Sequence, residues 1–380
     1  MADFNEVFLK PLFKLQQTHL MRRLSILPLL FLFSYCEAQK LLRSDLGLAT
    51  PAVKYCTPVK DQNMSGTCWC FSSTSLLESE LMKKGKGAQD LSEMFIARHS
   101  MMRKIERHLK LKGSNFFTPG GQFHDAVWVI KNFGMVPEEI YSGKGRGEVN
   151  HNHAEMDTLL SYLVKECIAN DVTALSVNQK FFVDSVLDSY YGKIPASFSY
   201  KNKTYTPQSY LTEYLGIKPD DYIEVTSYTH HPFYTKFVLE DKYNWTGDEY
   251  WNVPLNDFSA ITDSALKNGF TVGWDGHAQD DYFDYIEGLA YMPAMIKDFP
   301  SARQAAFEDK STELDHMMHI VGSARDKSGK KWYYIKNSWG NTNTMGGFLW
   351  MRDDYFKMRT LAIIVNKAAI PTGIRRKMRL

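Results

Sequence analysis

Cys68 is the residue of this sequence best placed to act as a nucleophile. It lies in the run Gly66-Thr67-Cys68-Trp69-Cys70, where the pattern predicts the first turn of a helix. The partial positive charge at a helix N-terminus stabilises a thiolate, which is the reactive form of cysteine. Attack on an amide also requires donors that hold the oxyanion, and Gln62 with the N–H of Cys68 could supply them. Taken alone, Cys68 would more often be a buried structural cysteine.

A base and an orienting group for that thiol occur in two later segments. His316 and His319 enter an apolar strand, and their odd spacing places them on opposite faces, so only one can face a cleft. The side-chain oxygen of Asn337 could accept the second N–H of the base, and Trp339 could shield that bond from water. A cysteine, a histidine and an asparagine in this order predict acyl transfer by an activated thiol.

These segments resemble the active-site blocks of the papain-like cysteine peptidases. The resemblance rests on Gln62, Cys68-Trp69, Leu314-Asp315-His316 and Asn337-Ser338-Trp339-Gly340, which stand in the family's order. It is closer to one branch, the bleomycin hydrolases and bacterial aminopeptidases C, through Gly120-Gly121-Gln122, residues 133–137 and segments 192–195 and 206–210. The resemblance implies peptide substrates and His316 as the base. It also implies that Gly120 and Gly121 line the substrate cleft and bind the peptide backbone.

The resemblance implies the fold as well. We expect an α+β, papain-like two-lobed fold, with a helical lobe that carries the nucleophile. An antiparallel β-barrel-like lobe would carry His316 and Asn337. Residues 39–380 would form a single peptidase domain, with 180–300 as an insertion typical of the bleomycin hydrolase branch and 301–380 as the strand-rich lobe. That branch forms hexamers, so a homo-oligomer is implied.

The sequence departs from the family at several places. Ser65 stands where papain has a structural cysteine, so that disulfide is not expected. Only residues 39–60 precede the catalytic block, so no inhibitory propeptide is expected. In bleomycin hydrolases the C-terminal tail lies in the cleft and restricts the enzyme to chain ends. This chain ends in the basic run 370–380 and is expected to stop short of that tail.

Four hypotheses about function stay open at this point. The first is an aminopeptidase, which the resemblance favours. The second is an endopeptidase with an open cleft, because of the short tail. The third is an inactive binding homologue, which is disfavoured because all four catalytic positions are filled. The fourth is an acyltransferase that uses the same residues.

Periodicity predicts the elements that must position these residues. Asp90-Leu91-Ser92-Glu93 looks like a capping box that opens a helix ending at Gly113. Segment 192–254 is irregular and aromatic, with a few short strands. Further helices are expected at 67–84, 123–133, 151–166, 178–191 and 258–268. Strands are expected at 319–322, 332–336, 347–351 and 361–365.

The N-terminus carries a targeting signal. Met21-Arg22-Arg23 opens a basic segment, residues 24–35 are apolar, and Cys36-Glu37-Ala38 presents a cleavage site before Gln39. We therefore expect residues 1–38 to be a leader with a signal peptide that starts at Met21. The apolar run is too short to span a membrane. Export to the periplasm or cell envelope of a bacterium is expected, with no membrane span after cleavage.

Composition narrows the possible partners. The 380 residues are 44% hydrophobic and 23% charged with a net charge of +2, so nucleic acid is not expected as the main partner. The four cysteines after residue 38 are too few for a disulfide framework, although a Cys56–Cys167 bridge stays open. The histidines at 151–153, 230–231 and 277 lack the spacing of a zinc helix, so no metal or cofactor is expected.

Overall fold

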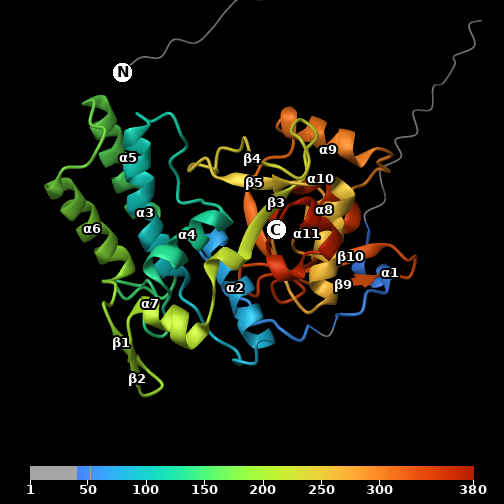
Figure 1. The fold of residues 1–380 in the computed structure, drawn as a ribbon, viewed down its shortest axis with the longest axis horizontal. Coiled ribbons are helices and arrows are strands. Elements are labelled where there is room, and N and C mark those ends of the chain that lie inside the picture. Colours follow the sequence, from blue (N-terminus) through green and yellow to red (C-terminus); the bar gives the residue numbers. More distant parts are fainter. Residues whose placement is uncertain (1–40, 52) are drawn as a thin grey trace, which may run out of the picture. The chain divides into compact units, whose positions relative to one another are not determined.

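The computed structural model describes residues 41–51 and 53–380, so the expected leader and its cleavage site lie outside the described residues. Residues Lys40–Leu380 form one compact unit. Figure 1 traces this unit from its blue N-terminal segment to its red C-terminal residues. Within the described part of the chain, no helix is both long enough and apolar enough to cross a bilayer.

Five helices form one half of this unit. Their apolar faces meet in a core that includes Phe95, Ile105, Phe123 and Leu187. The helices predicted by periodicity in this half are confirmed within three residues at each end. They are α2 (Cys68–Lys83), α3 (Glu93–Lys110), α4 (Phe123–Phe133), α5 (Ala154–Ala169) and α6 (Val177–Tyr191).

A ten-stranded sheet forms the other half, in the order β4-β5-β3-β12-β6-β9-β10-β11-β8-β7. The α+β class is confirmed, but the sheet stays open in the described residues rather than closing into a barrel. Its end strands contain two or three residues each, too few to form a closing ladder. The strands are β3 (Tyr222–Thr226), β4 (Lys236–Val238), β5 (Glu249–Asn252), β6 (Val272–Gly276), β7 (Phe283–Asp284), β8 (Leu289–Ala290), β9 (His316–Arg325), β10 (Lys331–Lys336), β11 (Phe348–Arg352) and β12 (Thr360–Asn366).

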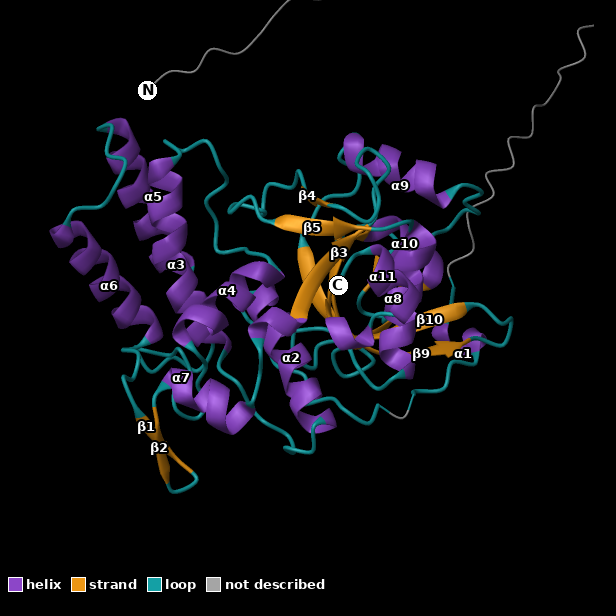
Figure 2. Cartoon of the chain, in the orientation of Figure 1, coloured by secondary structure: helices purple, strands orange, loops and turns teal. Residues whose placement is uncertain are grey.

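The two faces of the sheet pack against different helices. Met317 and Ile364 join the core of the helical half, whereas Met318 and Ile363 join a second core. Neighbouring residues of a strand point to opposite faces, which explains this division. Figure 2 shows helices of the second core grouped beside the sheet, away from α2. They are α8 (Leu255–Lys267), α10 (Asp353–Arg359) and α11 (Thr372–Lys377), with α9 (Phe299–Glu308) nearby.

Short elements complete the chain and join its two halves. They are α1 (Arg43–Leu46), the hairpin β1 (Phe198–Tyr200) and β2 (Lys203–Tyr205), α7 (Pro207–Ser209), a π-helical turn (Tyr210–Leu215) and two 3₁₀ turns (Pro219–Asp221 and Lys367–Ala369). Strands β3 to β8 come from the segment 180–300 and lie in the same sheet as the later strands. The limits of that segment as an insertion stay a prediction.

The start of α3 corrects one expectation. The helix begins at Glu93, and its N-cap is Ser92, whose hydroxyl accepts the N–H of Phe95. The predicted capping box at Asp90 is therefore wrong. The Asp90 carboxylate lies 2.5 Å from the ammonium of Lys60 instead, so it is engaged by a charge rather than by the helix end.

The structure settles the disulfide that the sequence left open and shows how the C-terminal run packs. Cys56 and Cys167 are both free, so the bridge left open by the sequence is not formed. The basic end packs as α11, with Ile374 and Met378 buried in the second core. Lys377 pairs with Asp257 of α8 at 3.3 Å.

Candidate active site

Helix α2 presents Cys68 as its first residue, after the N-cap Thr67. The side chain stays partly accessible at this helix start. Burial raises the pKa of the Cys68 thiol to about 11, and the backbone N–H groups of Met317 and Trp69 only partly offset that rise. The N–H of Met317 faces the Cys68 sulfur, so the start of strand β9 lies beside the nucleophile. Ser72 adds a second link, because its hydroxyl donates to the carbonyl of Met318 at 2.6 Å.

His316 opens β9, directly before the residue whose N–H faces the Cys68 sulfur. Its Nε2 donates to Oδ1 of Asn337 at 2.6 Å, so Nδ1 is the ring nitrogen left for the thiol. The ring of Trp339 stacks on the imidazole with centroids 4.4 Å apart. This stacking and the surrounding chain leave His316 only 4% exposed.

Burial acts against charge on both members of this pair. It lowers the pKa of His316 to about 4, although the Asn337 bond works in the opposite direction. It raises the pKa of Cys68, as described above. An isolated charge on either group is therefore unfavourable, and proton transfer from the thiol to the imidazole must be stabilised by their mutual attraction.

His319 lies outside this cluster. Its Nδ1 is 2.8 Å from the hydroxyl of Ser75 on α2, in the packed interior behind the site. His316 and His319 therefore have separate partners, as their odd spacing on a strand predicts.

Gln62 is held by the segment that carries Asn337. The hydroxyl of Ser338 donates to Oε1 of Gln62 at 2.7 Å, and the backbone N–H of Gln62 donates to the carbonyl of Ser338 at 2.8 Å. Asp61 and Trp339 form a bridge beside these bonds. Because Oε1 is occupied, the amide NH₂ of Gln62 is the part left to donate to an oxyanion.

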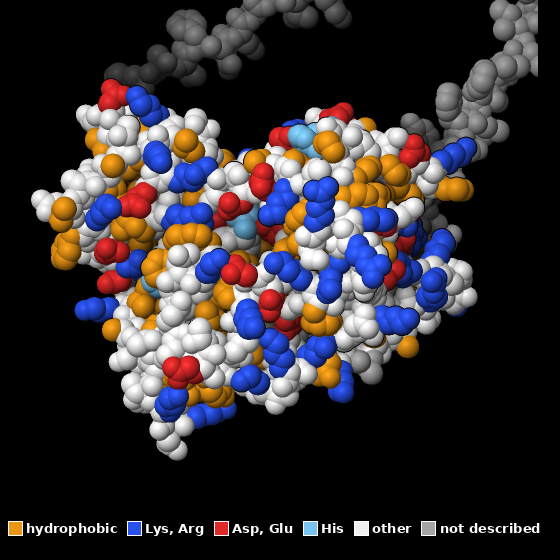
Figure 3. Space-filling view, in the orientation of Figure 1, with side chains coloured by type: hydrophobic (Ala, Val, Ile, Leu, Met, Phe, Trp, Pro, Cys, Tyr) orange, Lys and Arg blue, Asp and Glu red, His pale blue; other side chains and the backbone are white. Residues whose placement is uncertain are grey.

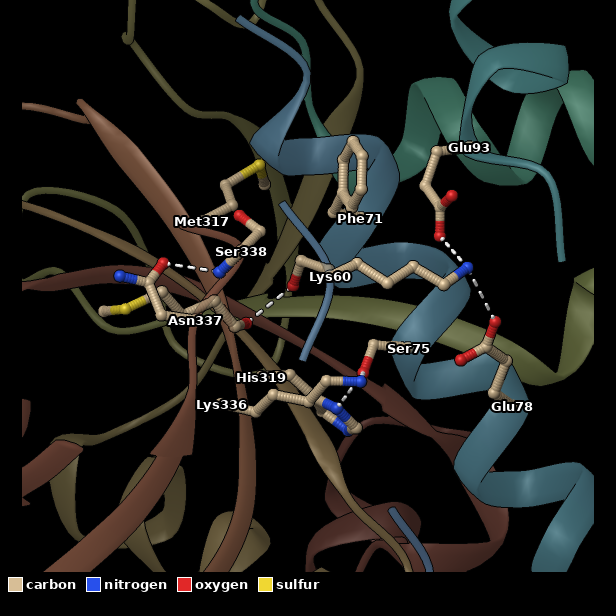
Figure 4. A pocket seen from close by; sticks show the side chains of 12 residues that line it. Lys60, Phe71, Ser75, Glu78, Glu93, Met317, His319, Lys336, Asn337 and Ser338 are labelled. Carbon is tan, nitrogen blue, oxygen red and sulfur yellow. Dashed lines mark hydrogen bonds and ion pairs between the residues drawn. The ribbon is translucent and has the colours of Figure 1, made fainter. Parts of the chain in front are cut away.

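An ion network with two buried carboxylates fixes the loop that precedes Gln62. Figure 4 shows the Lys60 side chain extended between Glu93 and Glu78, with Nζ–O distances of 2.7 and 3.3 Å. The same view shows Ser75 close to the ammonium of Lys336, and its hydroxyl accepts at 2.8 Å. Both carboxylates belong to helices of the first half, so this network ties the Gln62 loop to α2 and α3.

Gly120 and Gly121 belong to a loop that packs against the ring of Trp69, the residue that follows Cys68. A Cβ atom on Gly121 would stand 2.9 Å from the Trp69 ring, so only glycine fits there. The loop before them is held by Lys104 of α3, which is 3% exposed. Its ammonium donates to the carbonyls of Thr118 (3.2 Å), Pro119 (2.9 Å) and Gly120.

Two family models match this chain. The model described as "Papain family cysteine protease" matches residues 47–186, and the model described as "Peptidase C1-like family" matches residues 195–379. The first covers the helices with Cys68, and the second covers the strands with His316 and Asn337. The chain belongs to the papain-like cysteine peptidases.

Its relatives in this family are similar over most of their length. Aminopeptidase G of Lactobacillus delbrueckii subsp. lactis is 23% identical over 81% of this chain and 80% of its own length. Aminopeptidase C of Streptococcus thermophilus is 23% identical over the same shares. Cysteine proteinase 1, mitochondrial, of Saccharomyces cerevisiae is 21% identical over 84% and 77%.

A solved structure has the same fold. The crystal structure of PepW from Lactobacillus rhamnosis HN001 superposes with a TM-score of 0.70 and 18% identity, over 88% of this chain and 85% of that one. The similarity covers both the helical half and the sheet, so the papain-like arrangement holds for this chain as a whole.

The structure of this papain-like peptidase brings four of the predicted site residues into one cluster: Gln62, Cys68, His316 and Asn337. Gly121 packs against Trp69, the residue next to Cys68, and Gly120 is its neighbour in the chain. Their catalytic and binding roles stay predictions. Sequence reasoning missed Ser338 and Lys104, which hold Gln62 and the Gly120 loop. A lysine on the apolar side of a helix is the signal that could have drawn attention to Lys104.

One histidine pair meets a carboxylate elsewhere on the surface. Nε2 of His231 lies 2.8 Å and Nε2 of His230 3.2 Å from the carboxylate oxygens of Glu240. Among the described residues, these three are the one group of His, Cys, Asp or Glu side chains whose ligand atoms all lie within 4.8 Å. Hydrogen bonds to Glu240 and ring stacking on Phe307 and Phe237 hold the two histidines in place.

Proposed function

We propose that this chain is a cysteine aminopeptidase in which Cys68 attacks the peptide carbonyl. The observation that carries the proposal is the His316–Asn337 hydrogen bond of 2.6 Å, beside the N–H that faces the Cys68 sulfur. The curated relatives named aminopeptidase C and G support release of N-terminal residues from peptides.

We infer the steps of the reaction from the positions of these residues. As the sulfur of Cys68 attacks, its proton moves to Nδ1 of His316. The amide of Gln62 and the N–H of Cys68 hold the oxyanion. His316 then protonates the leaving amine, and water activated by the same imidazole releases the acyl group from sulfur. Asn337 keeps the imidazole in the orientation that both proton transfers require.

Substitution of Cys68 tests this assignment. We expect Cys68→Ala to abolish peptide hydrolysis and labelling by iodoacetamide at this position, because no other described group can form the acyl–sulfur bond here. Cys56→Ala is the matched control and should retain both, since Cys56 lies outside the site. Undiminished peptide turnover in Cys68→Ala would show that Cys68 is not the nucleophile.

Product analysis separates hydrolysis from acyl transfer. A peptidase releases the free amino acid, whereas an acyltransferase with the same residues would transfer the acyl group to an added amine. Mass spectrometry of reactions with and without an amine acceptor distinguishes the two. We expect the hydrolysis product to dominate, because water reaches the partly exposed Cys68 position.

We further infer that the protein is exported, and that the resemblance to the bleomycin hydrolase branch extends to a homo-oligomer. The basic and apolar pattern of residues 21–38 supports export to the periplasm or cell envelope. Fractionation of the producing cells tests the location, and light scattering of the purified protein tests the oligomer.

A further inference from the structure

The loop between β4 and β5, residues Leu239–Asp248, connects the two halves of the molecule beside the active site. We call it the strap. In Figure 1 this yellow segment leaves the sheet toward the helices α3 and α4. In Figure 3 the surface between the two halves is hollowed and lined by acidic side chains around a histidine. The strap therefore lies at the boundary between the two halves, where the proposed site also lies.

One end of the strap is fixed to the wall that carries His316. The carboxylate of Asp241 accepts the N–H of Tyr243 at 2.8 Å and is also faced by the N–H of Leu314. Lys242 pairs with Glu313 at 3.0 Å. Leu314 comes two residues before His316, so this end is anchored at the base of β9.

The other end of the strap is fixed to the helical wall. The indole N–H of Trp245 donates to the carboxylate of Asp125 on α4 at 2.7 Å. The carbonyl of Trp245 accepts from Arg107 of α3 at 2.8 Å. Thr246 lies 3.0 Å from Nε2 of His124, also on α4. Trp245 is buried, so this anchor is packed as well as hydrogen-bonded.

Tyr243 stands between these anchors, directly over Gly120. A Cβ atom on Gly120 would lie 2.7 Å from the Tyr243 ring, so the ring touches the helical wall. The same ring packs against the cluster that contains Leu314, so it also touches the sheet wall. Burial is the main cause that raises the pKa of Tyr243, and negative charge on Asp241, Cys68 and Asp315 raises it further, which is consistent with a ring that lies near the site. The edge of Phe116 supports it from outside, with centroids 5.3 Å apart.

The direction of the substrate follows from the proposed chemistry. The leaving amine must lie beside His316, which protonates it. The acyl part, which holds the amino end of the substrate, therefore extends to the other side of the sulfur, toward Gly121 and Gly120. That path ends at the ring of Tyr243, which joins the two walls.

We propose that Tyr243, held by the strap, closes the acyl side of the cleft after the first residue and so restricts this peptidase to free N-termini. The inference rests on the proposed function of Cys68 and names the residue that limits its substrates. The restriction to free N-termini is thus assigned to the strap, which is anchored at both ends. It is not assigned to the C-terminal residues. Those residues pack against α8 through Ile374 and Met378.

The test compares one peptide with a free N-terminus and the same peptide with an N-acetyl cap. We expect the unmodified protein to hydrolyse the capped peptide at least about 100-fold more slowly than the free one. Tyr243→Ala should raise the capped-to-free ratio of kcat/KM at least about 10-fold, because it removes the ring between the walls. Tyr243→Phe should keep the original ratio, because the ring and not the hydroxyl fills the space.

Controls separate this inference from folding and from the function itself. Tyr162→Ala, an exposed tyrosine on α5, should leave activity and ratio unchanged. Iodoacetamide labelling of Cys68 confirms an intact site in each variant, and Tyr243→Leu replaces Tyr243→Ala if the latter does not fold. Equal hydrolysis of both peptides by the unmodified protein, or an unchanged ratio in Tyr243→Ala and Tyr243→Leu, would overturn the role of Tyr243 and leave Cys68 catalysis standing. Failure to hydrolyse either peptide and to label Cys68 would overturn both.

Discussion

His316 and Asn337 are joined by a hydrogen bond, yet their contributions to catalysis should differ widely. In the proposed mechanism His316 moves a proton in both steps, so His316→Ala should lower kcat by about 10³- to 10⁴-fold. We propose that Asn337 only orients the ring, through one bond of 2.6 Å, so Asn337→Ala should lower kcat by about 10-fold. Steady-state kinetics on a free-amine peptide measures both. Asn337→Ala as damaging as His316→Ala would mean that the amide takes part in the proton transfer itself.

Residues of the site differ in how far the sequence predicts them. Cys68, His316 and Asn337 stand in short segments whose neighbours carry the information, so their grouping can be predicted from residue types and order. Lys104 leaves a weaker signal, a charge on the apolar side of a helix. Tyr243 leaves none, because its contact with Gly120 joins segments far apart in the chain.

At the scale of elements, Lys104 joins helix α3 to the loop that ends at Gly120. Lys104→Met keeps the length of the side chain but removes the charged donor of three part-buried carbonyls, of which that of Pro119 still accepts from the indole of Trp69 at 3.1 Å. We expect the free energy of unfolding to fall by about 2–4 kcal/mol and KM to rise, because the loop loosens. Chemical denaturation and kinetics measure these effects. Lys110→Met, an exposed lysine of the same helix, is the control and should change neither.

A second link between elements should make stability depend on pH. His124 of α4 lies 2.7 Å from Glu224 of β3. Burial alone would lower the pKa of His124, but Glu224 and Asp125 outweigh burial and raise it to about 9 from its ordinary 6.5. The protonated histidine therefore stabilises the fold. This stabilisation, up to about 3 kcal/mol, is complete below pH 6.5 and is lost as the pH rises through 9.

Denaturation curves between pH 6 and 10 measure this effect. We expect the difference in unfolding free energy between the unmodified protein and His124→Gln to shrink across that range. Glu224→Gln should remove most of the same pH dependence, since it removes the partner charge. A difference that stays constant from pH 6 to 10 would contradict the ionic character of the link.

Elements with many turns could be predicted, whereas short ones and their order could not. Helices α2 to α6 repeat an apolar face over three or more turns, which periodicity detects. Helices α10 and α11 contain seven and six residues, too few to show a repeat. The last strand, β12, lies between β3 and β6, far from its neighbours in sequence. No local pattern encodes that insertion into the sheet.

At the scale of the whole molecule, the site exists only where the two halves meet. The helical half supplies Cys68 and Gly120, and the sheet supplies His316 and Asn337. The strap crosses this boundary beside the site, as do the hydrogen bond from Ser72 to the carbonyl of Met318 and the contact between Ser75 and His319. Loss of the strap's anchors should therefore affect catalysis before it affects the cores, because no residue of the strap belongs to either of the two larger cores.

The expected leader should be dispensable for this assembly, whereas the segment just after it should not. The compact unit begins at Lys40, the N–H of Leu41 donates to the hydroxyl of Tyr291, and Leu46 is buried beside Trp350. Removal of residues 1–38 should leave the unfolding free energy and activity unchanged. Removal of residues 1–48 should lower the unfolding free energy by about 2–3 kcal/mol, the contribution of burying Leu46.

Denaturation of the two truncated proteins measures this difference in stability. N-terminal sequencing of protein from the cell envelope should give a sequence that begins near Gln39. A mature protein that keeps Met1, or a loss of stability on removing residues 1–38, would contradict the role of that segment as a leader.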